Sequence, residues 1–116
     1  MNKNKRLYTV AEILSLTGTT RKTLYYYDKI GLLIPTDRIG PQAHKLYDED
    51  ALEHLKMILR YRKAGLKINE IKLVISSSVP ERRNIYEKVL DRLMKEKEEK
   101  ENTIINLMAI MEEELS

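Results

Sequence analysis

The chain has 116 residues, of which 42% are hydrophobic and 34% charged, and it carries a formal net charge of +3 without any cysteine. The lack of cysteine excludes disulfides, thiolate metal sites and cysteine nucleophiles, and no stretch approaches the roughly 18 unbroken apolar residues of a membrane span. Residues 1–6 are polar and basic and lead into no signal-peptide core, so we expect a soluble cytoplasmic protein with one compact domain and room for an appended element.

Two short helices are predicted close to the amino terminus. Residues 9–12, Thr-Val-Ala-Glu, form a capping box, in which the Thr9 and Glu12 side chains satisfy each other's backbone amides. Gly18 ends this first helix, and Thr20 is placed to cap the next one. Two helices around a tight glycine turn outline a helix-turn-helix.

The second helix is predicted to run from about Arg21 to Ile30, with Leu24 and Tyr27 on its buried face. Three adjacent tyrosines at 25–27 span about 200° of a helix, so they cannot all point inward as core residues. An outward tyrosine offers a flat apolar ring and a hydroxyl to a sugar-phosphate backbone. The outward side is expected to carry these basic and aromatic side chains: Arg21, Lys22, Tyr25 and Tyr26.

Residues 31–47 predict a β-hairpin. An extended apolar run at 32–34 is followed by a loop with Gly40 and Pro41 and by a second extended piece at 44–47. This hairpin is a candidate wing, and its positive or potentially positive side chains are Arg38, His44 and Lys45.

A third helix is predicted to open with the acidic residues 48–50, which the helix dipole favours, and to stop at Gly65. Its apolar stripe consists of Leu52, Leu55, Ile58 and Leu59. A fourth, short helix shows a common apolar side made of Ile68, Ile71, Val74 and Ile75.

A long last helix is predicted from Pro80 to Leu115, because no glycine or proline interrupts this stretch. At about 1.5 Å per residue it reaches about 54 Å, longer than a front domain roughly 30 Å across. Its two apolar clusters, 85–94 and 104–111, flank a charged run, and exposed clusters of this kind need a partner. An antiparallel second copy would set one cluster against the other, so we expect a homodimer. The residues expected at its interface are Ile85, Val89, Leu93, Ile104, Met108 and Met111.

Charge supports the same division into a front domain over residues 6–78 and a dimerisation helix over 79–115. Residues 1–78 carry 14 Lys and Arg against 8 Asp and Glu, a net charge of +6, whereas residues 79–116 carry 7 against 10, a net charge of −3. A basic front half suggests a polyanion as partner. His44 and His54 are ten positions apart with no evident partner ligand, so no metal or cofactor is expected.

The residues taken together resemble the amino-terminal domain of the MerR family of transcriptional regulators. The pieces that carry the resemblance, over roughly Arg6 to Ser78, are residues 8–13, Thr23-Leu24, Tyr26-Tyr27-Asp28, Gly31-Leu32-Leu33, Pro35, residues 47–50, residues 62–66 and residues 70–72. The resemblance implies a mainly α fold: a winged helix-turn-helix of four helices and a small hairpin wing, followed by a long antiparallel coiled-coil dimerisation helix.

The resemblance also implies a function. Such dimers bind a palindromic operator inside a promoter whose −35 and −10 elements lie too far apart, with recognition helices in successive major grooves and wings on the flanking backbone. Activators of the family distort the spacer so that RNA polymerase engages both elements, and effectors are usually sensed after the dimerisation helix.

Carried over by position, the resemblance places Lys22, Tyr25 and Tyr26 against DNA, together with Thr20 and Arg21 at the start of the same helix. It places Arg38, His44 and Lys45 in the wing and brings Arg62 near a phosphate. The family usually has arginine at positions 22 and 25, and Gly-Tyr-Arg where this chain has residues 43–45. Since lysine and tyrosine cannot reproduce the bidentate fork of arginine, we expect an atypical operator.

Several alternatives remain open from the sequence. Only Ser116 follows Leu115, so the chain is a minimal regulator without a ligand, a truncated piece, or a protein whose ligand sits between dimer helices near Met94, Met108 and Met111. The alternative function is a helical protein–protein interaction module with a scaffold-only front domain. No phosphate loop, metal-ligand spacing or nucleophile–base pair suggests an enzyme.

Overall fold

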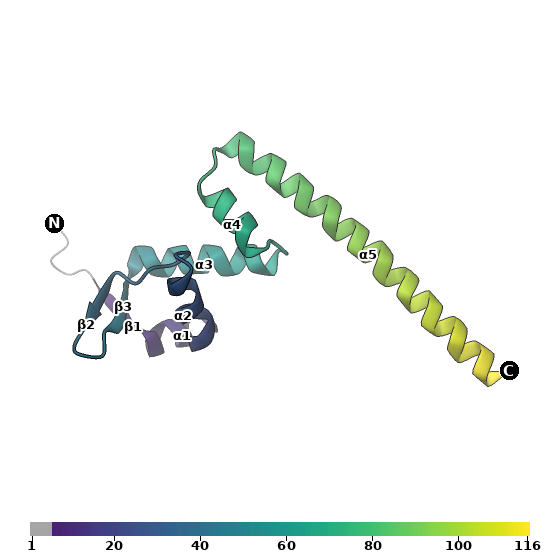
Figure 1. Ribbon diagram of the computed structural model, residues 1–116, viewed down its shortest axis with the longest axis horizontal. Coiled ribbons are helices and arrows are strands. Elements are labelled where there is room, and N and C mark those ends of the chain that lie inside the picture. Colours follow the sequence, from purple (N-terminus) through teal and green to yellow (C-terminus); the bar gives the residue numbers. More distant parts are fainter. Residues whose placement is uncertain (1–5) are drawn as a thin grey trace. The chain divides into compact units, whose positions relative to one another are not determined.

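The computed structural model describes residues 6–116, and Figure 1 shows its helices and strands. In chain order the elements are β1 (Leu7–Thr9), α1 (Val10–Thr17), α2 (Arg21–Lys29), β2 (Asp37–Ile39), β3 (His44–Asp48), α3 (Glu49–Lys63), α4 (Ile68–Ile75) and α5 (Val79–Leu115). The fold is mainly helical, as expected. Contacts divide the chain into a front unit ending at Ala64 and a rear unit starting at Gly65. The structure therefore groups α4 with α5, whereas the sequence pattern predicts a boundary after Ser78.

The helix-turn-helix of the front unit forms as its capping residues predict. Glu12 N donates to Thr9 Oγ1 at 3.2 Å, and Thr9 N donates to Glu12 Oε1 at 3.0 Å. Gly18 follows α1 with φ 74°, a left-handed conformation that glycine adopts without Cβ strain. Thr20 then caps α2 by accepting from Thr23 N at 3.1 Å.

The predicted hairpin is present as β2 and β3, which pair antiparallel with Arg38 opposite Lys45. Its turn closes with a bond from Ala43 N to Gly40 O at 3.0 Å. The first strand begins at Asp37 rather than in the apolar run at 32–34. The physical reason is burial. Leu32 and Leu33 lie in the loop after α2, and their side chains are buried in the core.

The sheet has a third strand that the sequence pattern does not predict. Strand β1 pairs antiparallel with β3, with Tyr8 opposite Tyr47, so the order is β1-β3-β2. Three residues are too few to show the alternation that identifies a strand. Pairing with the adjacent β3 therefore decides the structure of this segment, and the wing hairpin is anchored on one side.

The core of the front unit uses the apolar faces that the periodicity predicts. Leu24 and Tyr27 of α2 are 0% and 4% exposed, and three residues of the predicted α3 stripe are buried. Leu59, the fourth member of that stripe, is only partly buried. Tyr47 is fully buried, and burial raises the pKa of its phenol to about 12, so the ring stays neutral.

In the rear unit, Arg92 of α5 holds this helix against α4. Its Nη1 donates to Glu70 Oε2 of α4 at 2.6 Å, and its Nη2 donates to the Gly65 carbonyl at 2.7 Å. The guanidinium holds the pKa of the Glu70 carboxyl below its usual range. Helix α5 begins as predicted, with Ser78 and Glu81 in a capping box, and runs unbroken to Leu115.

Among residues 6–116, none of the helices combines the length and the apolar composition that crossing a membrane requires.

Candidate nucleic-acid interface

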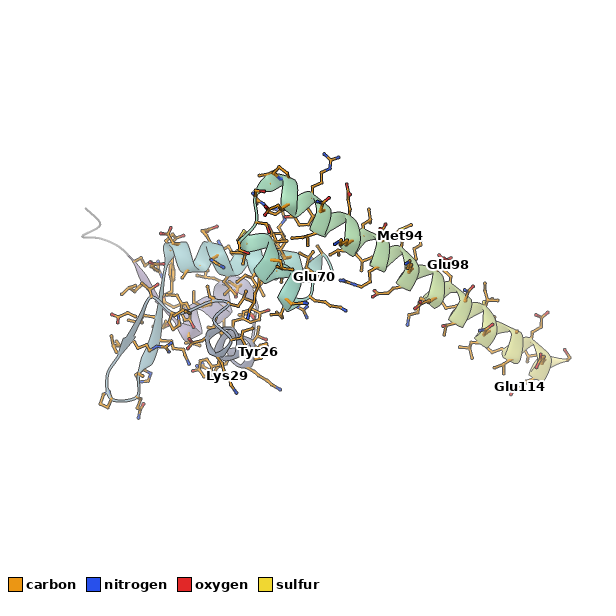
Figure 2. The ribbon with its side chains drawn as sticks, turned by 45° about the horizontal axis from the view of Figure 1, so that its top comes forward. Tyr26, Lys29, Glu70, Met94, Glu98 and Glu114 are labelled. Atoms are coloured by element: carbon orange, nitrogen blue, oxygen red, sulfur yellow. The ribbon has the colours of Figure 1, made fainter. Side chains whose placement is uncertain are left out.

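The outward face of α2 presents aromatic and basic side chains to solvent. Tyr25 is 41% exposed and Tyr26 50% exposed, while Leu24 and Tyr27, which flank them in the sequence, are buried in the core. Lys22 is exposed on the same helix. In Figure 2 the labelled Tyr26 and Lys29 lie together at this part of α2. Helical geometry thus separates three adjacent tyrosines into one core residue and two surface residues.

The first turn of α2 is ordered by its own side chains. The Thr20 hydroxyl donates to Thr23 Oγ1 at 2.9 Å in addition to capping the helix. Arg21 Nη1 donates to the Tyr25 hydroxyl at 3.4 Å, one turn further along. Thr20 and Arg21 therefore mark the exposed amino end of the helix, where backbone amides and positive charge both favour an anion.

Asp28 joins the wing to this helix. Arg38 of β2 donates through Nη1 and Nη2 to the two oxygens of Asp28, at 2.8 and 2.7 Å. Lys45 Nζ of β3 lies 3.5 Å from Asp28 Oδ2 and 3.8 Å from the centre of the Tyr25 ring. These four residues, Tyr25, Asp28, Arg38 and Lys45, form what we call the wing clasp.

The electrostatics of the wing clasp keep it charged. The hydrogen bonds from Arg38, followed by its charge and by Lys45, hold the pKa of the Asp28 carboxyl below its usual range, against the opposing effect of burial. The same carboxylate raises the pKa of Arg38. The Asp28 side chain is only 12% exposed and pairs with Arg38 and Lys45, so its charge is compensated within the protein.

A groove of about 460 Å³ opens between the start of α1, α2 and the wing. It brings together four predicted site residues, Arg21, Tyr25, His44 and Lys45, from two separate elements. The remaining lining residues are Thr9, Val10, Ala11, Ile39, Gln42, Ala43 and Leu46. Cationic side chains above an apolar floor suit a phosphate backbone with its sugars.

Five predicted residues do not line this groove: three belong to the start and outer face of α2 (Thr20, Lys22 and Tyr26), and two lie elsewhere (Arg38 and Arg62). The Arg38 guanidinium is engaged by Asp28, and the residue does not line the groove. Arg62 is exposed near the end of α3 and does not line it either. Asp28 was not predicted as a site residue, although one signal was available: it is the single acidic residue of α2, facing a basic hairpin.

The predicted interface residues of α5 fall into two environments. Val89 is 3% exposed, and Ile85 and Leu93 are partly covered, all within the chain itself. Ile104, Met108 and Met111 are 51%, 61% and 53% exposed. Next to the covered residues, Leu90 and Met94 are 57% and 56% exposed, so they extend the open apolar surface of the second half toward the start of the helix.

Metal ligation has no assembled site in the described part of the chain. No three His, Asp or Glu side chains among residues 6–116 come together as a candidate ligand set. His44 lies at the wing, and the Nε2 of His54 is buried without a hydrogen-bond partner among those residues. The chemistry that the front unit offers is therefore that of a charged, aromatic surface.

Comparison with known proteins identifies the family. The sequence model described as MerR HTH family regulatory protein matches residues 8–78. The HTH-type transcriptional activator TipA of Streptomyces coelicolor is 38% identical over 64 residues, which are 55% of this chain and 25% of TipA, so the chain spans a quarter of that relative.

Solved structures agree. The N-terminal part of the Bacillus subtilis multidrug transporter activator, MtaN, superposes with a TM-score of 0.73 at 27% identity, covering 90% of this chain and 97% of MtaN. EcmrR in its cryo-EM complex with DNA gives a TM-score of 0.69 at 26% identity, covering 79% of this chain and 34% of EcmrR. The chain belongs to the MerR family of helix-turn-helix regulatory proteins.

Proposed function

We propose that this protein is a homodimeric transcription regulator that binds a palindromic operator within a promoter. The proposed mode of action is distortion of the DNA spacer, which controls how RNA polymerase engages the promoter. Membership of a regulator family supports the general role, and the solved EcmrR–DNA complex supports DNA as the partner.

One observation carries the proposal: α2 and the wing present a single basic, aromatic surface. Lys22 and Tyr26 on α2 are exposed, and the groove beside them collects Arg21 and Lys45. An α-helix of this size fits the major groove of B-DNA, while a hairpin at its side reaches the flanking backbone. The cations neutralise phosphates and the tyrosines contact sugars.

Binding of this kind depends strongly on salt. Each phosphate that a lysine or arginine neutralises releases a counterion, so the logarithm of the affinity falls linearly with the logarithm of the salt concentration. We expect a steep slope for the wild-type protein. Lys45→Ala is expected to make that slope shallower by about one phosphate contact, whereas Tyr26→Ala leaves it unchanged.

The direct test is operator affinity measured by fluorescence anisotropy on a site mapped by DNase I footprinting. Tyr26→Ala and Lys45→Ala are each expected to lose at least about tenfold, equivalent to roughly 1.4 kcal/mol. The matched control is Lys56→Ala, which removes one exposed lysine of α3 that pairs with Glu53. Unchanged affinity in both test variants would reject our assignment of the DNA surface.

The footprint tests the finer part of the proposal. A protected palindrome with hypersensitive central bases is expected if the dimer distorts the spacer. Uniform protection without hypersensitivity would refute distortion while leaving DNA binding intact. A dimer that binds no duplex at low salt would refute the regulator and favour the alternative, an interaction module that uses the exposed apolar side of α5.

The wing clasp predicts a counterintuitive effect of removing a negative charge. Asp28→Asn makes the DNA surface more positive, which by charge alone strengthens binding. Because Asp28 positions Arg38 and Lys45, we expect instead about a tenfold loss of operator affinity.

The control for that variant is Asp37→Asn, which removes the same charge from β2. Asn retains the oxygen that accepts from Arg38 N at 2.8 Å, so the wing keeps its local bond. Asp37→Asn is expected to bind as tightly as the wild type or slightly more tightly. Equal gains in both variants would show that Asp28 contributes charge alone and has no positioning role.

A further inference from the structure

An open seam runs along α5 on the side that the chain does not cover. Positions three and four apart, repeating every seven residues, place one row of side chains on a common face. The members of this seam are Leu90, Met94, Lys97, Glu101, Ile104, Met108 and Met111. All are exposed. The heptad spacing places Lys97 and Glu101 on the same face as the apolar members.

The seam has a two-fold pattern. Two apolar positions precede the pair Lys97 and Glu101, and apolar positions follow it at matching spacings. In an antiparallel coiled coil, each seam residue of one helix faces a seam residue of the other in a layer. A second copy of this chain is therefore the occupant whose own seam complements this one.

We propose that two α5 helices pair antiparallel in one register fixed by a central charged layer. This inference rests on the homodimer of the proposed function and adds its register and the pair that selects it. The layers, each occurring twice by symmetry, are Leu90 with Met108, Met94 with Ile104, and Lys97 with Glu101.

The two neighbouring registers explain the selection. Sliding one helix by seven residues in one direction sets Met94 against Lys97 of the second copy, and Glu101 against Leu90. Sliding in the other direction sets Glu101 against Ile104, and Lys97 against Met108. Both registers bury a charge against an apolar side chain without a partner, which is costly. In the central register the charged layer joins opposite charges, and the two layers on either side of it join apolar side chains.

The flanking layer is compatible with this register. Glu87 faces Met111 of the second copy, but its carboxylate lies at the rim, where it pairs with Arg83 of its own helix at 3.6 Å. The central pair instead faces the charged pair of the second copy. Lys97 precedes Glu101 by four positions, and this order gives the weaker intrahelical pair.

The register matters for the proposed function because it sets a distance. A slide of seven residues displaces the two helices by about 10.5 Å at about 1.5 Å per residue. Each DNA-binding front unit is covalently joined, through α4, to the start of its α5. Half-sites on one face of DNA recur only once per helical turn, about 34 Å, so such a displacement is incompatible with the same operator.

Charge reversal with mixed chains tests the register. The K97E homodimer places two carboxylates together in each of the two central layers, and the E101K homodimer places two ammonium groups together in each. Both homodimers are expected to form about tenfold more weakly than the wild type by analytical ultracentrifugation. In a one-to-one mixture of K97E and E101K chains, both central layers of the heterodimer join opposite charges: one layer joins the two reversed side chains and the other joins the two unchanged ones. We therefore expect mostly heterodimer, by native mass spectrometry, with near-wild-type affinity.

The mixture separates the effect of contacts between chains from the effect of helix propensity. Each substituted chain has the same helix propensity in its homodimer and in the heterodimer, so only the contacts between chains differ. The matched control reverses Lys95 and Glu99, a Lys–Glu pair with the same spacing and outside the seam. K95E and E99K are expected to dimerise like the wild type and to mix in the statistical one-to-two-to-one ratio. A statistical mixture of K97E with E101K would overturn the register.

Cross-linking gives an independent reading, since the chain has no native cysteine. A chain with Leu90→Cys is mixed with chains carrying one cysteine at position 101, 108 or 115. Position 108 lies opposite Leu90 in the proposed register. Positions 101 and 115 lie opposite it after a slide of seven residues in one or the other direction. Only Met108→Cys is expected to form the intermolecular disulfide rapidly, because a disulfide requires Cα atoms within about 7 Å. Preferred cross-linking at 101 or 115 would overturn the proposed register but leave the homodimer standing. A monomeric wild type would overturn both.

Discussion

The two halves of α5 share one secondary structure and have opposite surroundings. In the first half, Val89 is 3% exposed and Leu93 packs on Gly65, while Arg92 bonds to Glu70. In the second half, every residue from Met94 to Leu115 is exposed. Figure 2 shows side chains projecting along this half, among them the labelled Glu98 and Glu114. One helix is thus folded into its own chain at one end and left open at the other.

The difference teaches what each half is for. Continuity of the helix is a local property, since no glycine or proline interrupts it and its charged run tolerates solvent. Burial is not local, and Ile104, Met108 and Met111 find no core within the chain. Contiguous exposed apolar residues on this scale mark an interaction surface. The first half therefore packs within the rear unit, and the second half is the surface through which we propose that the dimer forms.

The largest expected effect comes from breaking the open half. Met108→Glu places a charge in the proposed dimer layer twice per dimer. Since burying one such side chain contributes roughly 1.5 to 3 kcal/mol, we expect dimerisation at least about 100-fold weaker. The measurement is sedimentation equilibrium, with circular dichroism to show that helix content in the front unit persists.

Asn106→Glu is the control for this variant, because it adds the same charge two positions away on the outer face of the helix. Its dimer is expected to match the wild type. Equal weakening in both variants would mean that charge on the tail, and not the seam, governs association.

A smaller effect is expected from breaking the packed half. Gly65 has φ 94°, and a Cβ added there meets Leu93 Cδ2 at 3.1 Å. Gly65→Ala therefore combines backbone strain with a steric conflict, and we expect a loss of about 2 kcal/mol in the free energy of unfolding by urea. Gly18→Ala provides the comparison, since Gly18 has φ 74° but open space around it.

Gly18→Ala is expected to lose only the strain, about 1 kcal/mol. The difference between the two substitutions measures how tightly α5 is packed on the start of the rear unit. If both cost the same, the contact between Leu93 and Gly65 contributes nothing beyond the conformation of the glycine.

The features that the sequence predicted are those set by neighbouring residues, such as helix starts and the buried faces of helices. Thr9 and Thr20 each cap a helix where a capping side chain is expected, and Leu24 and Tyr27 are buried where the helical period puts them. The outward tyrosines of the site, at positions 25 and 26, follow from the same period. All of these depend on neighbours within about four positions, which a sequence displays directly.

What the sequence did not predict depends on pairing between distant segments. Strand β1 exists because β3 lies beside it, and β2 starts late because the core takes the leucines before it. Asp28 becomes a site residue only when the hairpin brings Arg38 to it, ten positions away. Which side of α5 stays open likewise depends on what covers Val89, a question of tertiary packing.

The smallest expected effect is a pH dependence that sharpens the description of the packed half. Arg92 holds the pKa of Glu70 below its ordinary value, so the pair stabilises the fold at and above the ordinary glutamate range and is lost as pH falls through the lowered pKa. Glu70→Gln removes this contribution. Between about pH 5 and pH 3, the free energy of unfolding of Glu70→Gln should fall less than that of the wild type. The difference between the two falls should be no more than about 1 kcal/mol at this screened site.

Glu96→Gln isolates the geometry of that pair. Glu96 contacts the same guanidinium at 3.6 Å through Nε, but its side chain is 56% exposed, against 16% for Glu70. A weaker, more hydrated contact contributes less, so Glu96→Gln should follow the wild-type curve through the acid range in chemical denaturation. If Glu70→Gln also follows the wild-type curve, the bond from Arg92 orients α4 against α5 without stabilising the fold. Apolar packing, such as that of Leu93 on Gly65, then holds the first half of α5 in place.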